Sequence, residues 1–194
     1  MTQTPANRDE GTLVARAQAG DRDAFGALAG LYAAPLYTFL VRRCGSRDGA
    51  EDLAQMALLR AWLKLPTYRA ARGPFLPWLL AVGNSVAVGE RRRRSVHTAP
   101  LNHEPAHLPA DSVEHAEARE ELWHLVDRLL PTDAASAVWL RYGENLEIGD
   151  IARVMSWTGV RVRITLYRAR HTLARALAGE QSGVTQKGDR AHAL

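Results

Sequence analysis

A short run of the chain, Gly73 to Arg94, carries side chains that suit contact with nucleic acid. It begins with an aromatic pair, Phe75 and Trp78, continues with the amide of Asn84 and ends in four consecutive arginines. Aromatic rings stack on unpaired bases, an amide hydrogen-bonds a base edge, and guanidinium groups bind phosphates. The run therefore predicts a surface for single-stranded nucleic acid. A buried helix with a solvated arginine tail accounts for the same residues equally well.

The same run predicts a helix that positions these side chains. Pro77 suits a first helical turn, where its missing N–H would be unpaired in any case. The apolar residues from Leu79 to Val88 are too many for a free surface helix. Gly83 and Gly89 each cost about 1 kcal/mol relative to alanine inside a helix. We therefore expect close backbone approach or bending at these two positions.

Charge is distributed unevenly along the 194 residues, although the net charge is only +4. Residues 1–94 carry 14 Lys and Arg against 8 Asp and Glu, residues 95–118 carry none against 4, and residues 119–177 carry 9 against 7. Two basic segments joined by an acidic link indicate two modules that face a polyanion. The length suits two small domains or one of medium size.

The composition also bears on compartment. Cys44 is the only cysteine, which fits a reducing interior. No run approaches the roughly 20 apolar residues of a membrane span. The N-terminal residues lack the apolar core of a secretory signal. We therefore expect a soluble, cytoplasmic protein with no direct insertion into a membrane.

Two kinds of chemical site receive little support from the sequence. An enzyme built on Cys44 and a linker histidine lacks an orienting acid, and a small buried cysteine is the more ordinary interpretation. A metal site is suggested by four histidines, which are His97, His103, His107 and His115. Their spacings match no standard zinc pattern and no cysteine accompanies them, so we expect no metal.

Before the basic run, three helices are expected. The first spans Thr12–Ala19, and the second spans Asp23–Val41, with Asp23 as its N-cap and a kink or break at Pro35. The inward stripe of the second helix should consist of Phe25, Leu28, Leu31, Tyr32, Leu36, Phe39 and Leu40.

The third helix follows the turn after Cys44. Asp48 is its expected N-cap, Glu51 completes a capping box, and Pro66 ends the helix. One side carries Leu53, Ala57, Arg60, Ala61 and Lys64, and another carries Asp52, Gln55 and Leu59. Such a helix needs more than one neighbour. It is either a plain amphipathic helix or one whose second face docks on a partner protein.

Residues 95–118 hold three prolines and no Lys or Arg, which is typical of a flexible linker. Four further helices are predicted, namely Glu117–Leu130, Thr132–Tyr142 with Thr132 as N-cap, Ile148–Met155 and Gly159–Leu177. A short helix, a three-residue turn and a longer helix make a helix-turn-helix, whose second helix enters the major groove of DNA. Residues 178–194 are expected to be disordered.

The last of these helices is strongly basic and holds no acid. Its arginines are Arg161, Arg163, Arg168, Arg170 and Arg175, and its inner face should consist of Val162, Leu166, Leu173 and Leu177. In the first helix of this module the inner stripe should consist of Leu122, Leu125, Val126 and Leu129. This concentration of arginine favours DNA binding over a simple helical hairpin.

In this order the segments resemble the extracytoplasmic-function, or group 4, sigma factors of the sigma-70 family, which direct bacterial RNA polymerase to promoters. AEDLAQMALLRAW resembles the family's helix for the polymerase clamp, and GPFLPWLLAVGN resembles its promoter-melting segment. LLPTDAASAVWLRY, IGDIARVM and LYRARHTLARAL resemble successive parts of its region four. Each motif alone is weak evidence, whereas the ordered set across two modules is strong.

The resemblance implies an all-α fold of two small helical domains joined by a flexible linker. Sigma region 2 would span 10–94, the linker 95–118, the helix-turn-helix of sigma region 4 would span 119–177, and 178–194 would form the disordered tail. It implies a protein that is not an enzyme and has no cofactor and no small-molecule substrate. Its partners would be core RNA polymerase, promoter DNA and an anti-sigma factor.

The resemblance also implies roles for particular residues. Asp52, Gln55 and Leu59 would bind the polymerase. The minus-ten element would be contacted by Phe75, Trp78, Asn84, Arg91, Arg92, Arg93 and Arg94. The minus-thirty-five element would be contacted by Arg161, Arg163, Thr165, Arg168 and Arg170.

The chain departs from the family pattern in three places. Met56 stands where an acidic residue is usual, Val88 stands where Asp is usual, and the recognition helix from Val160 to Leu166 keeps only the usual Val and Leu, with Arg in place of Lys. The residues expected to face the major groove therefore differ from those usual in the family. Two alternatives stay open, namely a helix-turn-helix regulator with a sensing or dimerising first module, and a sigma-like protein that does not itself direct initiation.

Overall fold

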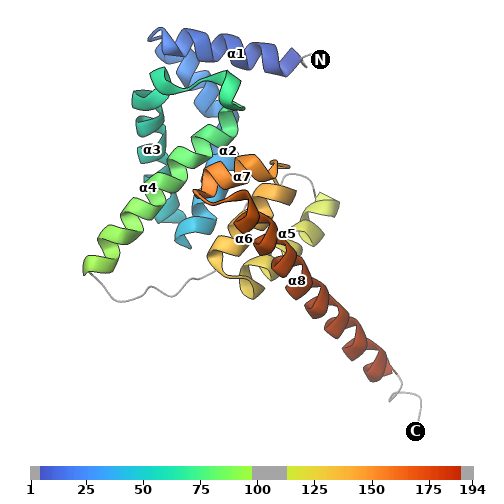
Figure 1. Ribbon diagram of the computed structural model, residues 1–194. Coiled ribbons are helices and arrows are strands. Elements are labelled where there is room, and N and C mark those ends of the chain that lie inside the picture. The colour runs from blue at the N-terminus through green and yellow to red at the C-terminus, as the bar shows by residue number, and fades with distance from the viewer. Residues whose placement is uncertain (1–4, 98–112, 189–194) are drawn as a thin grey trace.

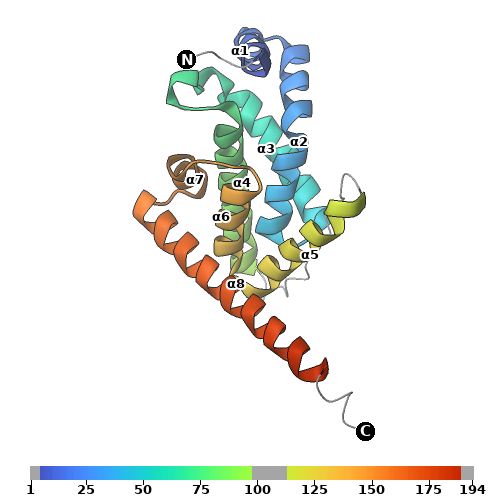
Figure 2. The ribbon, with the colours of Figure 1, turned by 90° about the vertical axis from the view of Figure 1, so that its right-hand side faces the viewer.

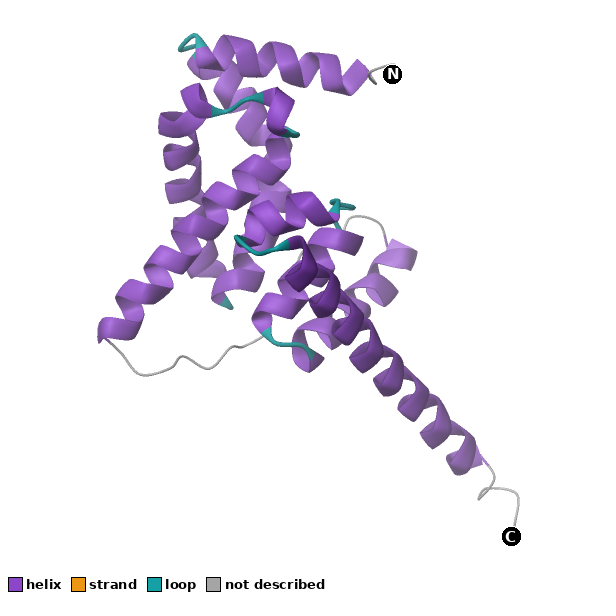
Figure 3. Cartoon of the chain, viewed as in Figure 1, coloured by secondary structure: helices purple, strands orange, loops and turns teal. Residues whose placement is uncertain are grey.

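The computed structural model describes the backbone of residues 5–97 and 113–188 and the side chains of residues 9–93 and 121–178. Every regular element in these described ranges is a helix, as Figure 3 shows. The first lobe consists of α1 (Pro5–Gln18), α2 (Arg22–Cys44), α3 (Arg47–Lys64), the 3₁₀ turns η1 (Leu65–Thr67) and η2 (Ala70–Arg72), and α4 (Phe75–His97). The second lobe consists of α5 (Val113–Leu129), α6 (Thr132–Tyr142), α7 (Ile148–Met155) and α8 (Gly159–Gly188). The expected all-α class with two helical domains is confirmed.

Three N-caps differ from the sequence-based expectation. The cap of α2 is Asp21, whose carboxylate accepts a hydrogen bond from the Ala24 N–H at 3.0 Å, so Asp23 lies in the first turn. The cap of α3 is Ser46, because Gly45 is left-handed and Ser46 is extended, and the expected capping box of Asp48 is wrong. The cap of α6 is Pro131, whose carbonyl accepts two N–H groups of the first turn, so Thr132 already belongs to the helix.

The second helix forms the centre of the first lobe. By length and composition alone α2 is apolar enough to cross a membrane, yet here α1, α3 and α4 all pack against it. Helix α2 continues through Pro35, where a kink or break was expected. Its fully buried side chains are Leu28, Leu36, Phe39 and Leu40. Leu31 is 60% exposed, so its place in the inward stripe is wrong; it lies on the helix flank that no neighbouring element covers.

A close helix crossing joins α4 to α2 at Gly83. A Cβ atom at this position would lie 2.9 Å from Leu36 Cδ1, so the glycine lets the two helices approach. The expectation of close approach is confirmed here. It fails at Gly89, where a Cβ atom would meet nothing within 4 Å.

The second lobe is built around α6, and α8 is its longest helix. Val162, Leu166 and Ala169 are the buried residues of α8, whereas Leu177 is exposed, contrary to the predicted inner face. Leu122 of α5 is exposed for the same reason, since each lies on a part of its helix without a covering neighbour. The helical backbone of α8 runs on through residues 178–188, which were expected to be disordered.

The two lobes pack against each other. Figure 1 shows α7 lying beside α4, and the contacts of α7 with α4 and of α6 with α2 form the interface. In Figure 2 the far end of α8 extends away from the body of the molecule. Most of the linker, residues 98–112, lies outside the described residues.

Candidate nucleic-acid interface

An aromatic cluster surrounds Phe75 at the start of α4. Its ring centroid lies 5.6 Å from that of Tyr32, 5.4 Å from that of Tyr68 and 5.3 Å from that of Trp78. Phe75 is 1% exposed, so it forms the buried centre of the cluster, whereas Trp78 is half-buried and reaches the surface. Tyr68 was missed by the sequence-based analysis. An aromatic residue in a basic loop just before the predicted helix was the available signal.

Polar contacts hold this cluster in place. The Tyr68 hydroxyl donates to the Gly73 carbonyl at 3.0 Å, and Gln18 Nε2 donates to the Leu65 and Tyr68 carbonyls at 2.9 and 3.0 Å. The Tyr32 hydroxyl donates to the Glu10 carboxylate. Burial raises the pKa of Tyr32, and the hydrogen bond to Glu10 raises it further. The cluster is therefore fixed by α1 as well as by its own rings.

Asn84 lies two and a half turns further along α4. It is 4% exposed, and its Oδ1 accepts no hydrogen bond from the described part of the chain. An unpaired buried amide oxygen costs about 1–3 kcal/mol. Packing alone gives no reason for an amide at this position, so Asn84 is a candidate for a functional role.

The basic end of α4 is remote from the aromatic cluster. Arg91, Arg92 and Arg93 are exposed, and Arg93 pairs with Glu90 at 3.2 Å. The backbone of Arg94 is helical, and its side chain lies outside the described ones. At 1.5 Å per residue, Phe75 and Arg91 are separated by about 24 Å along the helix axis. A strand that touched both ends would have to follow the length of α4.

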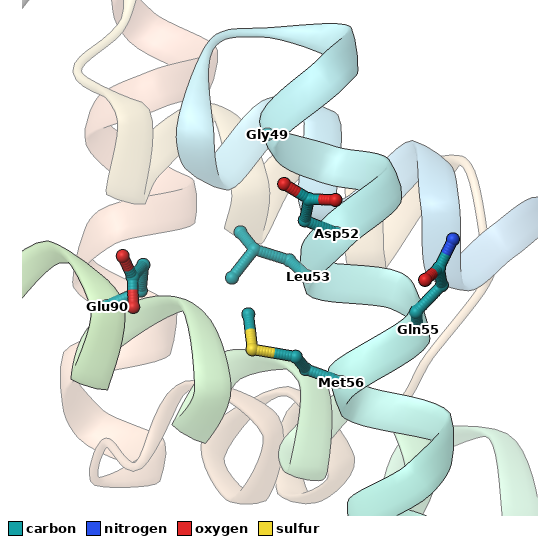
Figure 4. A pocket seen from close by; sticks show the side chains of 6 residues that line it. All are labelled: Gly49, Asp52, Leu53, Gln55, Met56 and Glu90. Carbon is teal, nitrogen blue, oxygen red and sulfur yellow. The ribbon is translucent and has the colours of Figure 1, made fainter.

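On α3 the predicted partner-binding residues share an exposed face. Asp52 and Gln55 are exposed, and Leu59 is 63% exposed. A surface hollow of ≈ 350 Å³ lies between α3 and α4. Figure 4 shows Asp52 and Met56 of α3 on one side of it. Glu90 of α4 closes its opposite side, so the hollow has carboxylates on both flanks.

The arginines of α8 lie on both flanks of its buried stripe, and the side opposite the stripe carries the exposed Val160, Ile164 and Tyr167. Arg161, Arg163, Arg168 and Arg170 are all exposed, and Thr165 is half-buried. Thr158 Oγ1 accepts the Arg161 N–H at 3.2 Å and so caps the first turn of α8. The arrangement matches a recognition helix whose exposed basic side chains can meet a phosphate backbone or base edges.

Two adjacent arginines at the end of α2 join the lobes. Arg42 forms an ion pair with both carboxylate oxygens of Asp127 on α5, and its guanidinium lies 4.9 Å from the Trp123 ring centroid. Arg43 pairs with Asp133 of α6 at 2.5 Å. The two arginine side chains are only 2% and 5% exposed. Burial lowers the pKa of Arg42 and raises the pKa of Asp127, as expected for an ion pair withdrawn from water.

Apolar and backbone contacts complete the interface between the lobes. Phe39 of α2 stacks with Trp139 of α6, with ring centroids 6.3 Å apart. The Arg153 guanidinium of α7 donates to the Arg72 carbonyl, beside Gly73. At Gly73 a Cβ atom would lie 2.5 Å from an Arg153 nitrogen. Helix α7 is therefore seated on α4 and on the loop that precedes it.

A metal site finds no support among the described side chains, which contain no group of three or more His, Cys, Asp or Glu suited to one. The side chains of His97, His103, His107 and His115 lie outside the described ones.

Comparison with known proteins gives a consistent set of relatives. A model of sigma-70 region 2 matches residues 28–96. The RNA polymerase sigma-H factor of Pseudomonas aeruginosa is 32% identical over 178 residues, which cover 85% of this chain and 92% of the relative. The ECF RNA polymerase sigma factor BldN of Streptomyces coelicolor is 33% identical over 171 residues. The match covers 85% of this chain and only 64% of BldN.

Two solved structures share the fold. One is CnrH in complex with the cytosolic domain of CnrY, with a TM-score of 0.63 and 21% identity over 88% of this chain and 98% of the other. The second is the sigma factor RpoE of Bartonella quintana in complex with the anti-sigma factor NepR. It has a TM-score of 0.63 and 21% identity over 79% of this chain and 96% of the other. At this identity the likeness concerns the fold.

Proposed function

Because the chain belongs to the sigma-70 family of RNA polymerase sigma factors, in its extracytoplasmic-function group, we propose that it binds core RNA polymerase and directs it to promoters. The observation that carries this proposal is the match to the Pseudomonas sigma-H factor, which covers 92% of that relative and includes both lobes. Sigma factors are initiation factors, so catalysis belongs to the polymerase and the chain itself is not an enzyme. We place its action in the cytoplasm, where the polymerase acts.

The exposed face of α3 is the proposed contact with the polymerase. Leu59 supplies an uncovered apolar side chain, while Asp52 and Gln55 supply polar groups beside it. An interface of this kind combines an apolar centre with a polar rim. Leu59 is largely solvent-exposed in the free chain and would lose that exposure on binding.

The second lobe is the proposed contact with duplex DNA at the minus-thirty-five element. The basic face of α8 is uncovered, which suits phosphate contacts that give affinity without sequence information. Arg163, Arg168 and Arg170 supply most of this charge, and Thr165 lies among them.

The first lobe is the proposed site that opens the minus-ten element. An unpaired base would stack on Trp78 and hydrogen-bond to Asn84, while Arg91 to Arg94 hold the phosphates. Phe75 is buried among rings of its own lobe, whereas Asn84 is buried in a helix on which α7 of the other lobe lies. We therefore propose that the lobes separate when the chain joins the polymerase, which uncovers α4 for the opened strand.

Promoter opening tests the role of α4. Variants Trp78→Ala and Asn84→Ala should abolish open-complex formation with core polymerase, because they remove the stacking face and the amide. Permanganate footprinting measures the exposed thymines, and co-purification with core polymerase should remain unchanged. Permanganate footprints like those of the unmodified chain would remove α4 from the mechanism.

Polymerase binding is tested separately on α3. Replacing Asp52 and Gln55 with Ala should weaken recovery of core polymerase in co-purification, and Leu59→Ala should weaken it further through the lost apolar contact. Glu51→Ala, on a neighbouring exposed position of α3, is the matched control. Equal recovery for all four proteins would place the polymerase contact elsewhere.

An anti-sigma factor is the proposed regulatory partner. RpoE of Bartonella quintana was solved in complex with the anti-sigma factor NepR, and it shares the fold of this chain. Such a partner would have to cover at least one of the two exposed surfaces, the α3 face or the basic face of α8. Competition between a candidate anti-sigma factor and core polymerase for the purified chain tests this.

A further inference from the structure

One arginine of α8 is held differently from the others. The Arg161 guanidinium lies 4.1 Å from the centroid of the Trp157 ring, and its Nη2 lies 3.8 Å from Asp133 Oδ2. For the remaining arginines of α8, the structure shows no ion pair or ring contact with another described side chain. These are Arg163, Arg168, Arg170 and Arg175. Arg161 is therefore the one with a defined resting position.

The indole that holds Arg161 is itself fixed by the turn of the helix-turn-helix. Ser156 adopts the left-handed conformation at φ 56°, and the Trp157 N–H donates to the Ala152 carbonyl at 2.8 Å. The half-buried Trp157 ring packs against the core of the lobe. Thr158 then caps α8, as described above. The ring therefore presents a rigid face to the first turn of the helix.

Stacking leaves the hydrogen-bonding edge of a guanidinium available. The five N–H groups of arginine lie in the plane of the group and point outward, whereas the contact with an aromatic ring uses its flat face. The Arg161 side chain is 57% exposed in spite of both contacts. It lies in the first turn of the helix that enters the major groove in this motif. An arginine held in this way can present two parallel N–H groups to a base edge.

We propose that Trp157 and Arg161 form a pre-oriented reader of guanine in the upstream promoter element. Arg161 donates two hydrogen bonds to guanine O6 and N7, and Trp157 is the positioning residue that holds the guanidinium plane. Guanine is the base with two acceptors side by side in the major groove, which matches the arginine fork. Pre-orientation increases affinity because less side-chain freedom is lost on binding. This inference rests on the proposed binding of duplex DNA by the second lobe.

Asp133 has a second role in this arrangement. It pairs with Arg43 of the first lobe at 2.5 Å and with Arg161 at 3.8 Å, so one carboxylate connects the lobe interface with the base reader. When the lobes separate, Arg43 leaves and Asp133 can draw closer to Arg161. It then steadies the guanidinium from one edge while the other edge faces the base.

The test is a selection of bound duplexes by the complete holoenzyme, made of core RNA polymerase and the full chain. The probe is a pool of promoter DNA with a randomised upstream window. The unmodified chain should enrich guanine at one position of that window. Arg161→Lys keeps the charge but loses the fork, so guanine preference at that position should fall by about 5- to 100-fold. The salt dependence of binding should stay unchanged.

Trp157 is tested by two variants. Trp157→Leu keeps apolar packing and removes the ring, so guanine preference should fall about 2- to 5-fold. Trp157→Phe keeps an aromatic face and should retain most of the preference, so its contrast with Trp157→Leu separates the ring contact from apolar packing. Circular dichroism and thermal melting establish that both variants fold. Arg168→Ala is the control, because loss of a phosphate contact should weaken all sequences alike and reduce the salt slope by about one.

The outcomes distinguish failure of guanine recognition by Arg161 and Trp157 from failure of the proposed function. If the guanine preference survives Arg161→Lys, Arg161 does not recognise the guanine, even though the holoenzyme still selects promoters. Equal preference in Trp157→Leu and the unmodified chain would overturn the positioning role. A holoenzyme that enriches no sequence at all would instead overturn the proposed function, and the reader with it.

Discussion

The two helices that the sequence assigned to DNA, α4 and α8, are placed in opposite ways. Helix α4 is packed by α2, α3 and α7, and its candidate base-contacting residues Phe75 and Asn84 are buried. Helix α8 packs along one stripe only, and its arginines face solvent. A DNA site on α8 is available in the free chain, whereas a site on α4 has to be uncovered first. Under the proposed function, affinity for duplex DNA and opening of the duplex would therefore be controlled separately in one chain.

The physical origin of the difference lies in the distribution of apolar residues. The apolar residues of α4 occur on several sides of the helix, and its buried ones include Leu79, Leu80, Val82 and Val86. A helix of this composition gains free energy from every neighbour that removes it from water. Helix α8 has one covered apolar stripe and leaves Val160, Ile164 and Tyr167 exposed on another side. The lobes close over α4 and leave the basic positions of α8 open.

The largest expected effect comes from breaking the ion pair that joins the lobes. Asp127→Ala leaves the Arg42 guanidinium, which is 2% exposed, without its carboxylate. Removing one partner of a buried pair costs about 3–5 kcal/mol, and separation of the lobes relieves this cost by returning Arg42 to water. Small-angle X-ray scattering should show an increased radius of gyration with helix content unchanged.

Arg93→Ala is the control for that variant, because its pair with Glu90 is on the surface and is worth at most about 1 kcal/mol. It should leave the radius of gyration as it is. If Asp127→Ala also stays compact, the cover over α4 does not depend on this ion pair.

The next effect tests the packing of α4 itself. Gly83→Ala places a Cβ atom 2.9 Å from Leu36 Cδ1, so the fully buried Leu36 side chain has to shift within the core. Overpacking of this kind costs about 1–3 kcal/mol, from which the helix propensity of alanine recovers part. Gly89→Ala meets nothing and should gain up to about 1 kcal/mol. Urea unfolding of both variants measures the difference, and the same sign for both would contradict the crossing at Gly83.

A smaller effect distinguishes function from stability on α4. Asn84→Leu replaces an amide whose Oδ1 is buried and unpaired within the described chain, so the free energy of unfolding should rise by about 1 kcal/mol. Promoter opening should be lost in the same variant. Ser136→Ala is the matched control, because its hydroxyl donates to the Thr132 carbonyl at 2.7 Å and its loss should cost about 1 kcal/mol. A large destabilisation by Asn84→Leu would indicate that the amide has a structural role.

The smallest effect is confined to the second lobe. Burial raises the pKa of Glu144 above its ordinary value of 4.5, so the folded state holds this proton more tightly than the unfolded state. The stability that the protonated Glu144 contributes is therefore lost as the pH rises from the pKa of the unfolded chain through the higher pKa of the folded chain. Glu144→Gln should match the unmodified chain near about pH 4 and exceed it slightly near about pH 7. Thermal melting at both pH values tests this, and a variant that is less stable at neutral pH would show the sign to be wrong.

Local patterns in the sequence were sufficient to predict the helices and the order of the two lobes. The bounds of α7 and the first residue of α8 were predicted correctly, because an apolar stripe ends at Met155 and the three-residue turn Ser156 to Thr158 follows. Cap assignments at Asp23, Asp48 and Thr132 were wrong, since several polar residues compete at each helix start and the backbone turn before the helix selects one. Leu31 and Leu177 were predicted to be buried because they continue the apolar stripe of their helix. Periodicity reveals such a stripe, but it does not reveal how far along the helix a packing neighbour extends.

The amino-acid sequence by itself determined the all-α class, the basic face of α8 and the family resemblance, because these depend on residue types and on spacing within single helices. Only the tertiary structure decided that Arg42 and Arg43 join the lobes, that Asp133 connects them to Arg161, and that Asn84 is covered. The ion pairs of Arg42 and Arg43 link residues 85 and 90 positions apart in the chain. Such pairing depends on how whole helices pack, and no local pattern specifies it.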